Sequence, residues 1–563
     1  MLSEKIIFSI PILAVGGAAA VHATAYIHGE AKRHLPRFWF FFLATLASMT
    51  AVVFADGKLP FLLAWEAMGL ASAGLVAFES KEKSVRKATW IYLLACHAGA
   101  CALMMAGVFL NRPDAAVAAF ACAVAGFGLK IGFPPFHSWL PEAHPAAPAP
   151  ASAIMSGAMI PLGFCGFFKF FQLCPGMMPD NAALCGWTFL ALGVIGSVGG
   201  ILFALPQANL KRLLAFSSVE NMGVVAMGLG LSFLITGQKA DEPLAMLCLG
   251  GALAHILNHA LLKGSLFLAA GSVLRQTGTL DQDRLGGLMR RMPFTGALFA
   301  VNAFGLAGLP PLSGFLGELA IYIAAFSAIK TGDPVLVAAG FLVAVALSVT
   351  GGLAVAAYAK AIGGAFLGEP RSQAAENAAE TPSRMWAAQL FLTCLSVAMI
   401  PGTVFLVHKT TGGFATDILL AAAVLGLAFA AVTVSLLLIR RFACPRGAEK
   451  PRLPVWDCGY DRPTTRMAYT ATAFTQPLVD LCRPLLRTRR HVIAFKGDPA
   501  SPSDAAIATE TDDLALGGLW RPVFTKVARL FQRAHLLQNG SLHLYILIIL
   551  MAVLALLVFA LVS

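Results

Sequence analysis

Ionisable side chains stand inside long apolar stretches of this sequence, where they are costly to bury. One such group at the centre of a membrane span costs about 2.5–3.5 kcal/mol on insertion scales, so it is retained where it has a function. A single one is more often a structural or interfacial charge, but eight in six apolar stretches indicate a shared proton pathway. These residues are Glu66, Lys130, Glu220, His255, His259, Lys263, Glu318 and Lys360.

Three of these residues, His255, His259 and Lys263, are spaced four apart. In a helix they lie on one face over about 12 Å. Histidine changes charge near neutral pH, so a mixed row of histidine, lysine and carboxylate groups can pass protons through intervening water. The alternative is a zinc or copper site on the two histidines, but no third ligand is local and a lysine comes next. We predict a ladder of proton-exchange groups and no metal in this chain.

Two proline pairs interrupt apolar stretches beside these charges. The segment GLKIGFPPFHSW places a pair shortly after Lys130, and GLPPLSGFLGE places a pair shortly before Glu318. Proline removes a backbone donor and clashes with the preceding turn, so a helix must break there, and a charge at such a break is a candidate site. The alternative is that the prolines only kink two packing helices. The prolines at the predicted breaks are Pro134, Pro135, Pro310 and Pro311.

The composition is that of a protein that crosses the membrane many times. Of the 563 residues, 58% are hydrophobic and 12% are charged, against roughly 25% charged residues in soluble domains. The net charge of +12 lies largely in short loops, which is typical of membrane topology and argues against a nucleic-acid partner. The eleven cysteines include no CxxC pair, so we expect redox centres only in partner subunits.

Fourteen apolar stretches are long enough for transmembrane helices. The first is predicted to be a retained helix rather than a signal peptide, because it is long and lacks a cleavage-type region. The predicted spans are 5–27, 37–56, 59–79, 88–111, 114–140, 150–173, 183–204, 210–235, 243–275, 293–330, 334–367, 385–407, 416–439 and 542–562.

Lysine and arginine are concentrated in the loops that follow odd-numbered spans, for example at Lys81, Arg86, Lys211 and Arg284. Such loops are cytoplasmic, so both termini are predicted outside, in a bacterial or archaeal inner membrane. This alternation requires that 114–140 and 150–173 each cross the bilayer.

The repeated Pro-Pro break predicts an all-α fold with an internal repeat. Helices 2–6 and 7–11 would form two five-helix units, each with its fourth helix broken, and an odd number of helices inverts the second unit. The predicted divisions are 1–36 (first helix), 37–173 and 183–367 (the inverted repeats), 385–440 (two helices), 441–541 (a cytoplasmic or lateral segment) and 542–563 (the last helix).

The segment 441–541 contains one amphipathic stretch. Between Leu516 and Leu537, apolar residues recur at helical spacing with arginines on the rest of the wheel. Such a helix would lie along the cytoplasmic membrane face or a neighbouring subunit. A small soluble loop domain is the alternative, because periodicity does not identify the surface a helix covers.

At these motifs the chain resembles the antiporter-like membrane subunits shared by respiratory complex I, Mrp antiporters and membrane-bound nickel–iron hydrogenases. The matching segments cover most of 37–370, and further motifs look most like the large membrane subunit of formate hydrogenlyase-type hydrogenases. The first group is AWEAMGL, GLKIGFPPFHSWLPEAHPAAPAPASAIMSG, NLKRLLAFSSVENMG, HILNHALLKGSLFLAAGSVL and GLPPLSGFLGE, and the second is SSVEN, YAKAIGGAFLGEPR and WDCGY followed by RMAYTATAFTQP.

The resemblance implies a role for each candidate residue. Glu66 would be the carboxylate of the first half-channel and Lys130 its partner at the broken helix, while Glu220 would be the matching carboxylate of the second repeat. The ladder in the ninth span would form the central axis, Glu318 the terminal site, and Lys360 would match a lysine of the hydrogenase branch. Nickel–iron and iron–sulfur centres are implied for partner subunits.

Two departures from the family pattern bear on function. Relatives usually carry a lysine or histidine in the helix after the first break, but this chain has Ser156 and Pro161 there, so Lys169 or water would have to substitute. The chain also begins about two helices later than family members usually do, which implies a late-assigned start or a shortened branch.

The sequence therefore predicts a proton-translocating subunit of a membrane-bound hydrogenase or complex-I-like oxidoreductase, with H+ or Na+ as the ion and no redox centre of its own. One alternative is an Mrp-like Na+/H+ antiporter subunit. Another is a membrane anchor for a redox arm that has lost transport, which the missing base at Ser156 and Pro161 keeps open.

Overall fold

The structure is a computed structural model that describes residues 4–28, 34–110, 112–175, 177–443, 469–498, 501–511 and 513–533, together with 547, 550 and 551. Thirteen helices among these residues are long and apolar enough to cross a membrane. They correspond to the first thirteen predicted spans. The predicted span 542–562 and the WDCGY motif lie outside the described residues, apart from positions 547, 550 and 551.

The first six spans contain one broken and one irregular helix. The fifth span consists of α5 and α6, separated at the first proline pair, and the sixth contains a π-helical turn between α7 and α8. The bounds are α1 Glu4–Tyr26, α2 Leu35–Phe54, α3 Lys58–Val76, α4 Lys83–Phe109, α5 Ala116–Ile131, α6 Leu140–Ala146, α7 Ala149–Ile154 and α8 Leu162–Leu173, with the π-helical turn at Met155–Met159.

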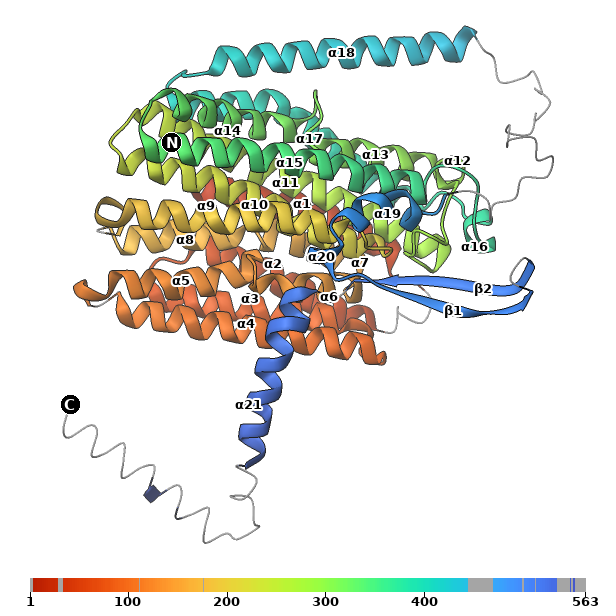
Figure 1. Cartoon of the computed structure of the whole chain (residues 1–563), viewed down its shortest axis with the longest axis horizontal. Helices are drawn as coiled ribbons and strands as arrows, with labels where there is room; N and C mark the ends of the chain where they lie inside the picture. The colour runs from red at the N-terminus through yellow and green to blue at the C-terminus, as the bar shows by residue number, and fades with distance from the viewer. Residues whose placement is uncertain are drawn as a thin grey trace. The chain divides into compact units, whose positions relative to one another are not determined.

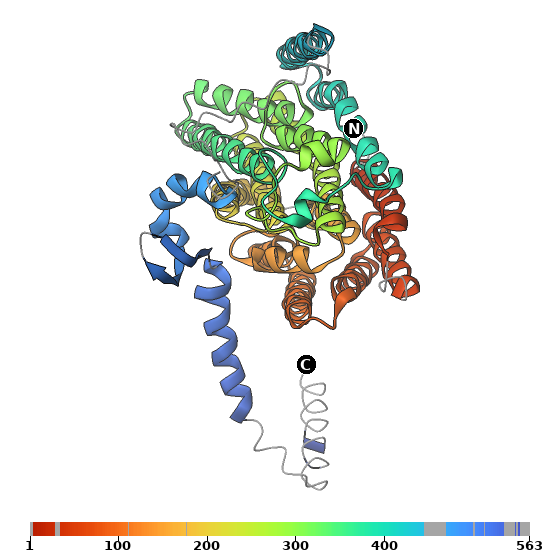
Figure 2. The same ribbon diagram turned by 90° about the vertical axis from the view of Figure 1, so that its right-hand side faces the viewer.

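The later spans include the second broken helix, where α13 and α14 replace the single predicted helix 293–330. The bounds are α9 Met177–Ala204, α10 Leu210–Gly237, α11 Glu242–Thr277, α12 Leu288–Arg291, α13 Pro293–Leu306, α14 Ser313–Lys330, α15 Pro334–Ala365, α16 Gln373–Glu376, α17 Ser383–Thr411 and α18 Thr416–Ala443. Figure 1 shows the spans lying side by side, and Figure 2 views them from one end.

Loops that follow odd-numbered spans meet at one end of the helices. The Leu210 amide donates to the Leu280 carbonyl at 3.0 Å, and the Gly287 amide donates to Leu367 at 2.9 Å. We call this end the basic side. At the opposite end, Lys5 pairs with Asp56 at 3.2 Å. These contacts agree with the alternation predicted from the charges for the loops that they join, while the bilayer crossings at 114–140 and 150–173 and the membrane side that each end faces stay predictions.

The largest packing interface in the bundle, between α9 and α10, depends on glycine. A methyl group on Gly223 would overlap the backbone nitrogen of Ser197, and one on Gly230 would lie 2.7 Å from the nitrogen of Leu190. Small residues let helix backbones approach closely, which is the main source of helix association in membranes. This close contact fixes α10, which carries Glu220, against its neighbour.

Between α18 and residue 512, the described residues form two helices and a β-hairpin that the sequence did not predict. Helix α19 (Ala471–Leu481) binds the basic side through Thr472, whose amide donates to Asp283 at 2.8 Å. It is followed by α20 (Arg483–Leu486) and by strands β1 (Arg489–Asp498) and β2 (Ser501–Glu510), which pair antiparallel. The spans themselves are entirely helical, so the predicted all-α membrane fold is confirmed.

Residues 512–563 form a second compact unit. Its described part is a π-helical turn, Ala515–Trp520, and α21, Arg521–Arg533. The predicted amphipathic helix is present, because Val523, Phe524 and Val527 recur on α21 among basic residues. The surface that it covers stays a prediction.

We predict that Gly223→Ala destabilises the protein, because the added methyl group overlaps Ser197 of α9. Overpacking of this kind costs about 1–3 kcal/mol. The matched control is Gly199→Ala on α9, whose methyl would have no neighbour within 4 Å, and which should be neutral or stabilising by up to about 1 kcal/mol through helix propensity. Thermal unfolding in detergent measures both, and equal midpoints would contradict the proposed packing.

Candidate functional site

The fifth span breaks at the first proline pair, as predicted. Gly132 takes a left-handed backbone conformation with φ of +86°, and the Pro134–Pro135 peptide bond is cis. The Trp139 indole donates to the Leu129 carbonyl at 2.8 Å. The indole thus supplies a hydrogen-bond partner for one carbonyl near the break. Backbone groups without a partner are costly in a membrane, so a broken helix needs such donors.

Lys130 lies one turn before the break and is 3% exposed. Its ammonium donates to the Tyr92 hydroxyl at 3.4 Å and to the Cys96 sulfur at 3.3 Å. The ring centroids of Tyr92 and Trp65 lie 5.3 and 5.9 Å from it, within reach of cation–π attraction. Ser72 shares a 2.6 Å hydrogen bond with Tyr92. The lysine is thus surrounded by neutral groups, so a nearby change of charge acts on it strongly.

Glu66 pairs with His97 rather than with Lys130. The carboxylate oxygen lies 3.3 Å from Nδ1 of His97, and the two side chains are 23% and 52% exposed. Glu66 is nevertheless close to the lysine site, because a methyl group on Gly69, one turn along α3, would lie 3.9 Å from the Lys130 ammonium. The pair therefore stands between Lys130 and the flank of the bundle.

The second break repeats the first with the charge on the other side of the prolines. Gly308 has φ of +66°, and the Pro310–Pro311 bond is cis. The Glu318 carboxylate packs against Gly308, where an added methyl would lie 2.6 Å from its oxygen. Helix α18 crosses this break, because a methyl on Gly426 would lie 2.6 Å from Pro311.

Lys263 is the centre of a buried hydrogen-bond network between α10, α11 and α15. Its ammonium donates to the Leu214 carbonyl at 2.9 Å and to the Ser217 hydroxyl at 2.8 Å. The Ser217 hydroxyl also lies 3.3 Å from Glu220 and 2.5 Å from the Tyr358 hydroxyl. One serine thus links the lysine to the carboxylate, and a change of charge at either reaches the other.

Asn221 extends this network to the predicted ladder. Its amide nitrogen donates to Glu220, and its oxygen lies 3.1 Å from Nε2 of His255. His259 is fully buried, and neither of its ring nitrogens has a hydrogen-bond partner among the described residues. No group of three or more His, Cys, Asp or Glu side chains that could hold a metal ion occurs in the described part of the chain.

Lys360 is placed apart from the other candidates. Its ammonium donates to the carbonyls of Leu205 and Gln207 at 2.6 and 2.9 Å, just beyond the end of α9 on the basic side. A cation there binds the carbonyls that a helix end leaves free. The hydroxyl of Tyr358, two residues earlier, takes part in the Lys263 network instead.

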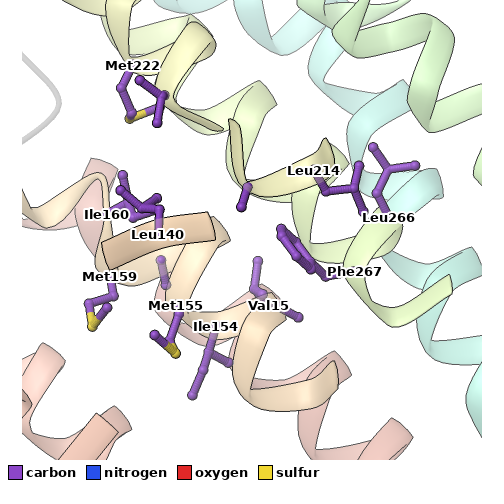
Figure 3. Packing of buried hydrophobic residues seen from close by; sticks show 14 of the residues in the cluster. Val15, Leu140, Ile154, Met155, Met159, Ile160, Leu214, Met222, Leu266 and Phe267 are labelled. Atoms are coloured by element: carbon purple, nitrogen blue, oxygen red, sulfur yellow. The ribbon is translucent and has the colours of Figure 1, made fainter. Parts of the chain in front are cut away.

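The two polar clusters are separated at the π-helical turn that contains Ser156. Ser156 lies in the π-helical turn and shares a 2.9 Å hydrogen bond with Ser218 of α10. Tyr92 of the Lys130 site contacts only the sulfur of Met159 from this turn, at 3.4 Å. Lys169 donates to the Ala55 carbonyl at 2.6 Å, near the end opposite the basic side. Figure 3 shows apolar side chains packed between the turn and α10, among them Met155, Met159, Ile160, Leu140 and Met222.

Several residues of these clusters were missed by sequence reasoning. They are neutral at ordinary pH, so the search for buried charge passed over them. Tyr92 and Cys96 are four residues apart, as are Ser217 and Asn221 on either side of Glu220. This spacing places each pair on one helix face and is the sequence pattern that could have identified them. Tyr358 has no comparable signal, because only the packing of α15 on α10 brings it to Lys263.

The sequence and the fold resemble those of known membrane complexes. A sequence profile described as "NADH:quinone oxidoreductase/Mrp antiporter, TM" matches residues 55–348. Hydrogenase-4 component B of Escherichia coli (strain K12) is 32% identical over 598 aligned positions, which cover 99% of this chain and 88% of that protein. Formate hydrogenlyase subunit 3 of the same organism is 37% identical over 385 positions, covering 65% and 60%.

Among solved structures, this fold is similar to a chain of the membrane-bound sulfane sulfur reductase, an archaeal respiratory membrane complex. The TM-score is 0.73 at 21% identity, and the match covers 98% of this chain and 88% of the other. This likeness shows a common fold. The relatives themselves are components of multisubunit assemblies.

We predict that His259→Met leaves the stability unchanged or raises it, because it replaces a buried ring with no hydrogen-bond partner by an apolar group of similar size. His255→Met should cost about 1–3 kcal/mol, since it leaves the Asn221 oxygen without its partner. Thermal unfolding of the two variants in detergent tests this difference. A larger loss of stability for His259→Met than for His255→Met would show that the His259 ring has hydrogen-bond partners in the membrane.

Proposed function

This chain belongs to the NADH:quinone oxidoreductase/Mrp antiporter family of membrane proteins, and from that premise we propose that it is a proton-translocating subunit of a membrane-bound hydrogenase or a related complex-I-like oxidoreductase. The family predicted from the motifs is confirmed. The direction of pumping and the choice of H+ over Na+ belong to the proposal.

The observation that carries the proposal is the buried network around Lys263. A lysine and a glutamate inside an apolar bundle share one serine, with Lys263 and Glu220 at 2.8 and 3.3 Å from the Ser217 hydroxyl. Buried ionic groups are costly, and they mark ion pathways in membrane proteins. A protonatable network that spans three helices is suited to carrying charge along the membrane plane.

The first break supplies the switch in this proposal. In the described part of the chain, Lys130 donates to two neutral side chains, and Glu66, which pairs with His97, lies one turn along α3 from Gly69, which is next to the lysine. In the closed state, the Glu66 carboxylate forms its ion pair with His97. In the open state, this ion pair is broken, and the carboxylate can stabilise the positive charge of Lys130. An opposite charge within about 4–6 Å strongly favours the charged form of a group. Rearrangement of the pair would therefore load or release a proton at Lys130.

Partner subunits supply the electron transfer in this scheme. The relatives named above belong to hydrogenase and formate hydrogenlyase systems, so we place nickel–iron and iron–sulfur centres in subunits that associate with this chain. The complex would reside in the inner membrane of a bacterial or archaeal cell, with both termini of this chain outside.

We predict that Lys130→Met and Glu66→Gln each abolish proton pumping by the assembled complex in vesicles, because each removes one charge of the switch. Lumen acidification during electron transfer measures the effect. The matched control is Lys5→Met, which removes a lysine that pairs with Asp56 at 3.2 Å at the end opposite the basic side and should leave pumping unchanged. Undiminished pumping by Lys130→Met would contradict the proposal.

We further predict that the chain purifies in mild detergent together with subunits that contain nickel and iron. Mass spectrometry and metal analysis of the purified complex test this. Isolation with antiporter subunits alone, together with Na+/H+ exchange in vesicles, would favour the antiporter alternative. An intact redox complex that moves no protons would favour the membrane anchor.

A further inference from the structure

A pocket on the basic side is acidic, although the loops around it are rich in lysine and arginine. It has a volume of about 300 Å³ and lies between the end of the third span, the start of α4, helix α6 and the start of α10. Three carboxylates and one guanidinium line it. The lining of the pocket includes Glu79, Glu82, Glu142, Ala146, Asn209 and Arg212.

Glu142 ties the pocket to the start of α10. Its carboxylate lies 3.2 Å from Arg212 and 3.9 Å from Lys87, and its side chain is 16% exposed. Asn209 caps α10 by accepting a hydrogen bond from the Arg212 amide at 3.1 Å. The carboxylates concentrate cations near the pocket, as charged clefts with apolar walls do.

A fully buried lysine lies directly behind the pocket wall. Lys211 is 0% exposed, and its ammonium donates to the Ala147 carbonyl at 2.6 Å, one residue from Ala146 of the lining. No ion pair within 4.0 Å joins Lys211 to an acid among the described residues, although an ammonium in such a setting would ordinarily have one.

His144 stands next along the same path. It is fully buried, and neither ring nitrogen has a hydrogen-bond partner in the described part of the chain. Its ring stacks on Phe267 of α11 at 4.9 Å between centroids. Phe267 is one turn from Lys263 along α11, and His144 lies three residues before Ala147, whose carbonyl accepts from Lys211. An imidazole between two lysines can take a proton on one nitrogen and release it from the other.

Helix α10 connects the pocket to the Lys263 network. Its residues run from Asn209 at the pocket, through Lys211, to Leu214, whose carbonyl holds Lys263, and on to Ser217. The distance along the helix from the cap to Ser217 is about 12 Å. Figure 3 shows Leu214 of α10 and Phe267 of α11 in the apolar packing around this path.

The geometry points to a proton-uptake route from the basic side, in which the acidic pocket collects protons and Lys211 and His144 pass them to Lys263. This inference rests on the proposed pumping function. Once Lys263 has released its proton and Lys211 is neutral, a proton from water in the pocket adds to the Lys211 amine, moves to His144 and then to the Lys263 amine, and each donor is left neutral for the next cycle.

The route is tested in the assembled complex with variants that keep polarity and remove titration. His144→Gln and Lys211→Gln should each slow proton pumping by about tenfold or more, since loss of a positioned proton-transfer group commonly costs about 10²-fold and water can replace part of it. Lumen acidification per electron transferred is the measure. Pumping at the unaltered rate by both variants would overturn the route.

Each variant has a matched control. His22→Gln changes another fully buried histidine without hydrogen-bond partners among the described residues, which packs near Gly271 and Tyr26. Lys5→Gln changes a lysine with no place on the route, which pairs with Asp56 at 3.2 Å at the end opposite the basic side. Both controls should pump normally, and equal slowing in a variant and its control would overturn the assignment.

Blocking the pocket gives a second readout that does not remove a buried residue. Ala146→Cys, modified by a bulky membrane-impermeant maleimide, should lose pumping when the reagent is added on the basic side only. Glu369→Cys, on an exposed loop of that side where Glu369 pairs with Arg290 at 3.0 Å, should tolerate the same modification. The unaltered complex with reagent controls for the native cysteines.

The two proposals fail in different ways. If Lys130→Met still pumps, the proposed function is wrong. If Lys130→Met abolishes pumping while the His144 and Lys211 variants and the modified Ala146→Cys protein all pump normally, the function stands and the uptake route is wrong. If a buried variant fails to assemble, the modified Ala146→Cys protein decides the question alone.

Discussion

The structure depends on how a positive charge is held inside an apolar bundle. Lys263 has no water-exposed surface, and the Leu214 carbonyl and the Ser217 hydroxyl of α10 hold its ammonium. An unpartnered charge would cost several kcal/mol in this environment. The glycines at the interface between α9 and α10 set the position of α10. The close packing of these two helices therefore also fixes where the groups that hold the Lys263 charge lie.

The two helix breaks also place polar groups inside the apolar bundle, where each needs a partner. A proline pair leaves backbone carbonyls and amides without partners, and the chain supplies some of them locally, as Trp139 does for Leu129. Each break then carries one charge beside it, a lysine before the first and a glutamate after the second. The first charge is surrounded by neutral groups, and the second packs against a glycine in a left-handed conformation. Irregular backbone and buried charge therefore occur together, because both need polar surroundings in a membrane.

The two halves of the charge path differ in continuity. The network from Lys263 to His255 is joined by side-chain hydrogen bonds. Between the Lys130 site and this network, the described contacts pass through a methionine sulfur and apolar side chains. A thioether carries no proton, so transfer across this gap requires a rearrangement or water. Among the described residues, the hydroxyl of Ser156 in the π-helical turn bonds to Ser218 of α10.

The sequence by itself determined the class of protein, thirteen of its spans, both breaks and the family, because hydropathy and prolines act locally along the chain. It also identified most of the buried charges, but not Lys211, which is fully buried. Only the tertiary structure decided which of them meet. It paired Glu66 with His97, set Lys360 at the end of α9, brought Tyr358 to Lys263 and placed His144 behind an acidic pocket. These contacts join residues distant in the sequence, and their geometry follows from helix packing, which no local pattern encodes.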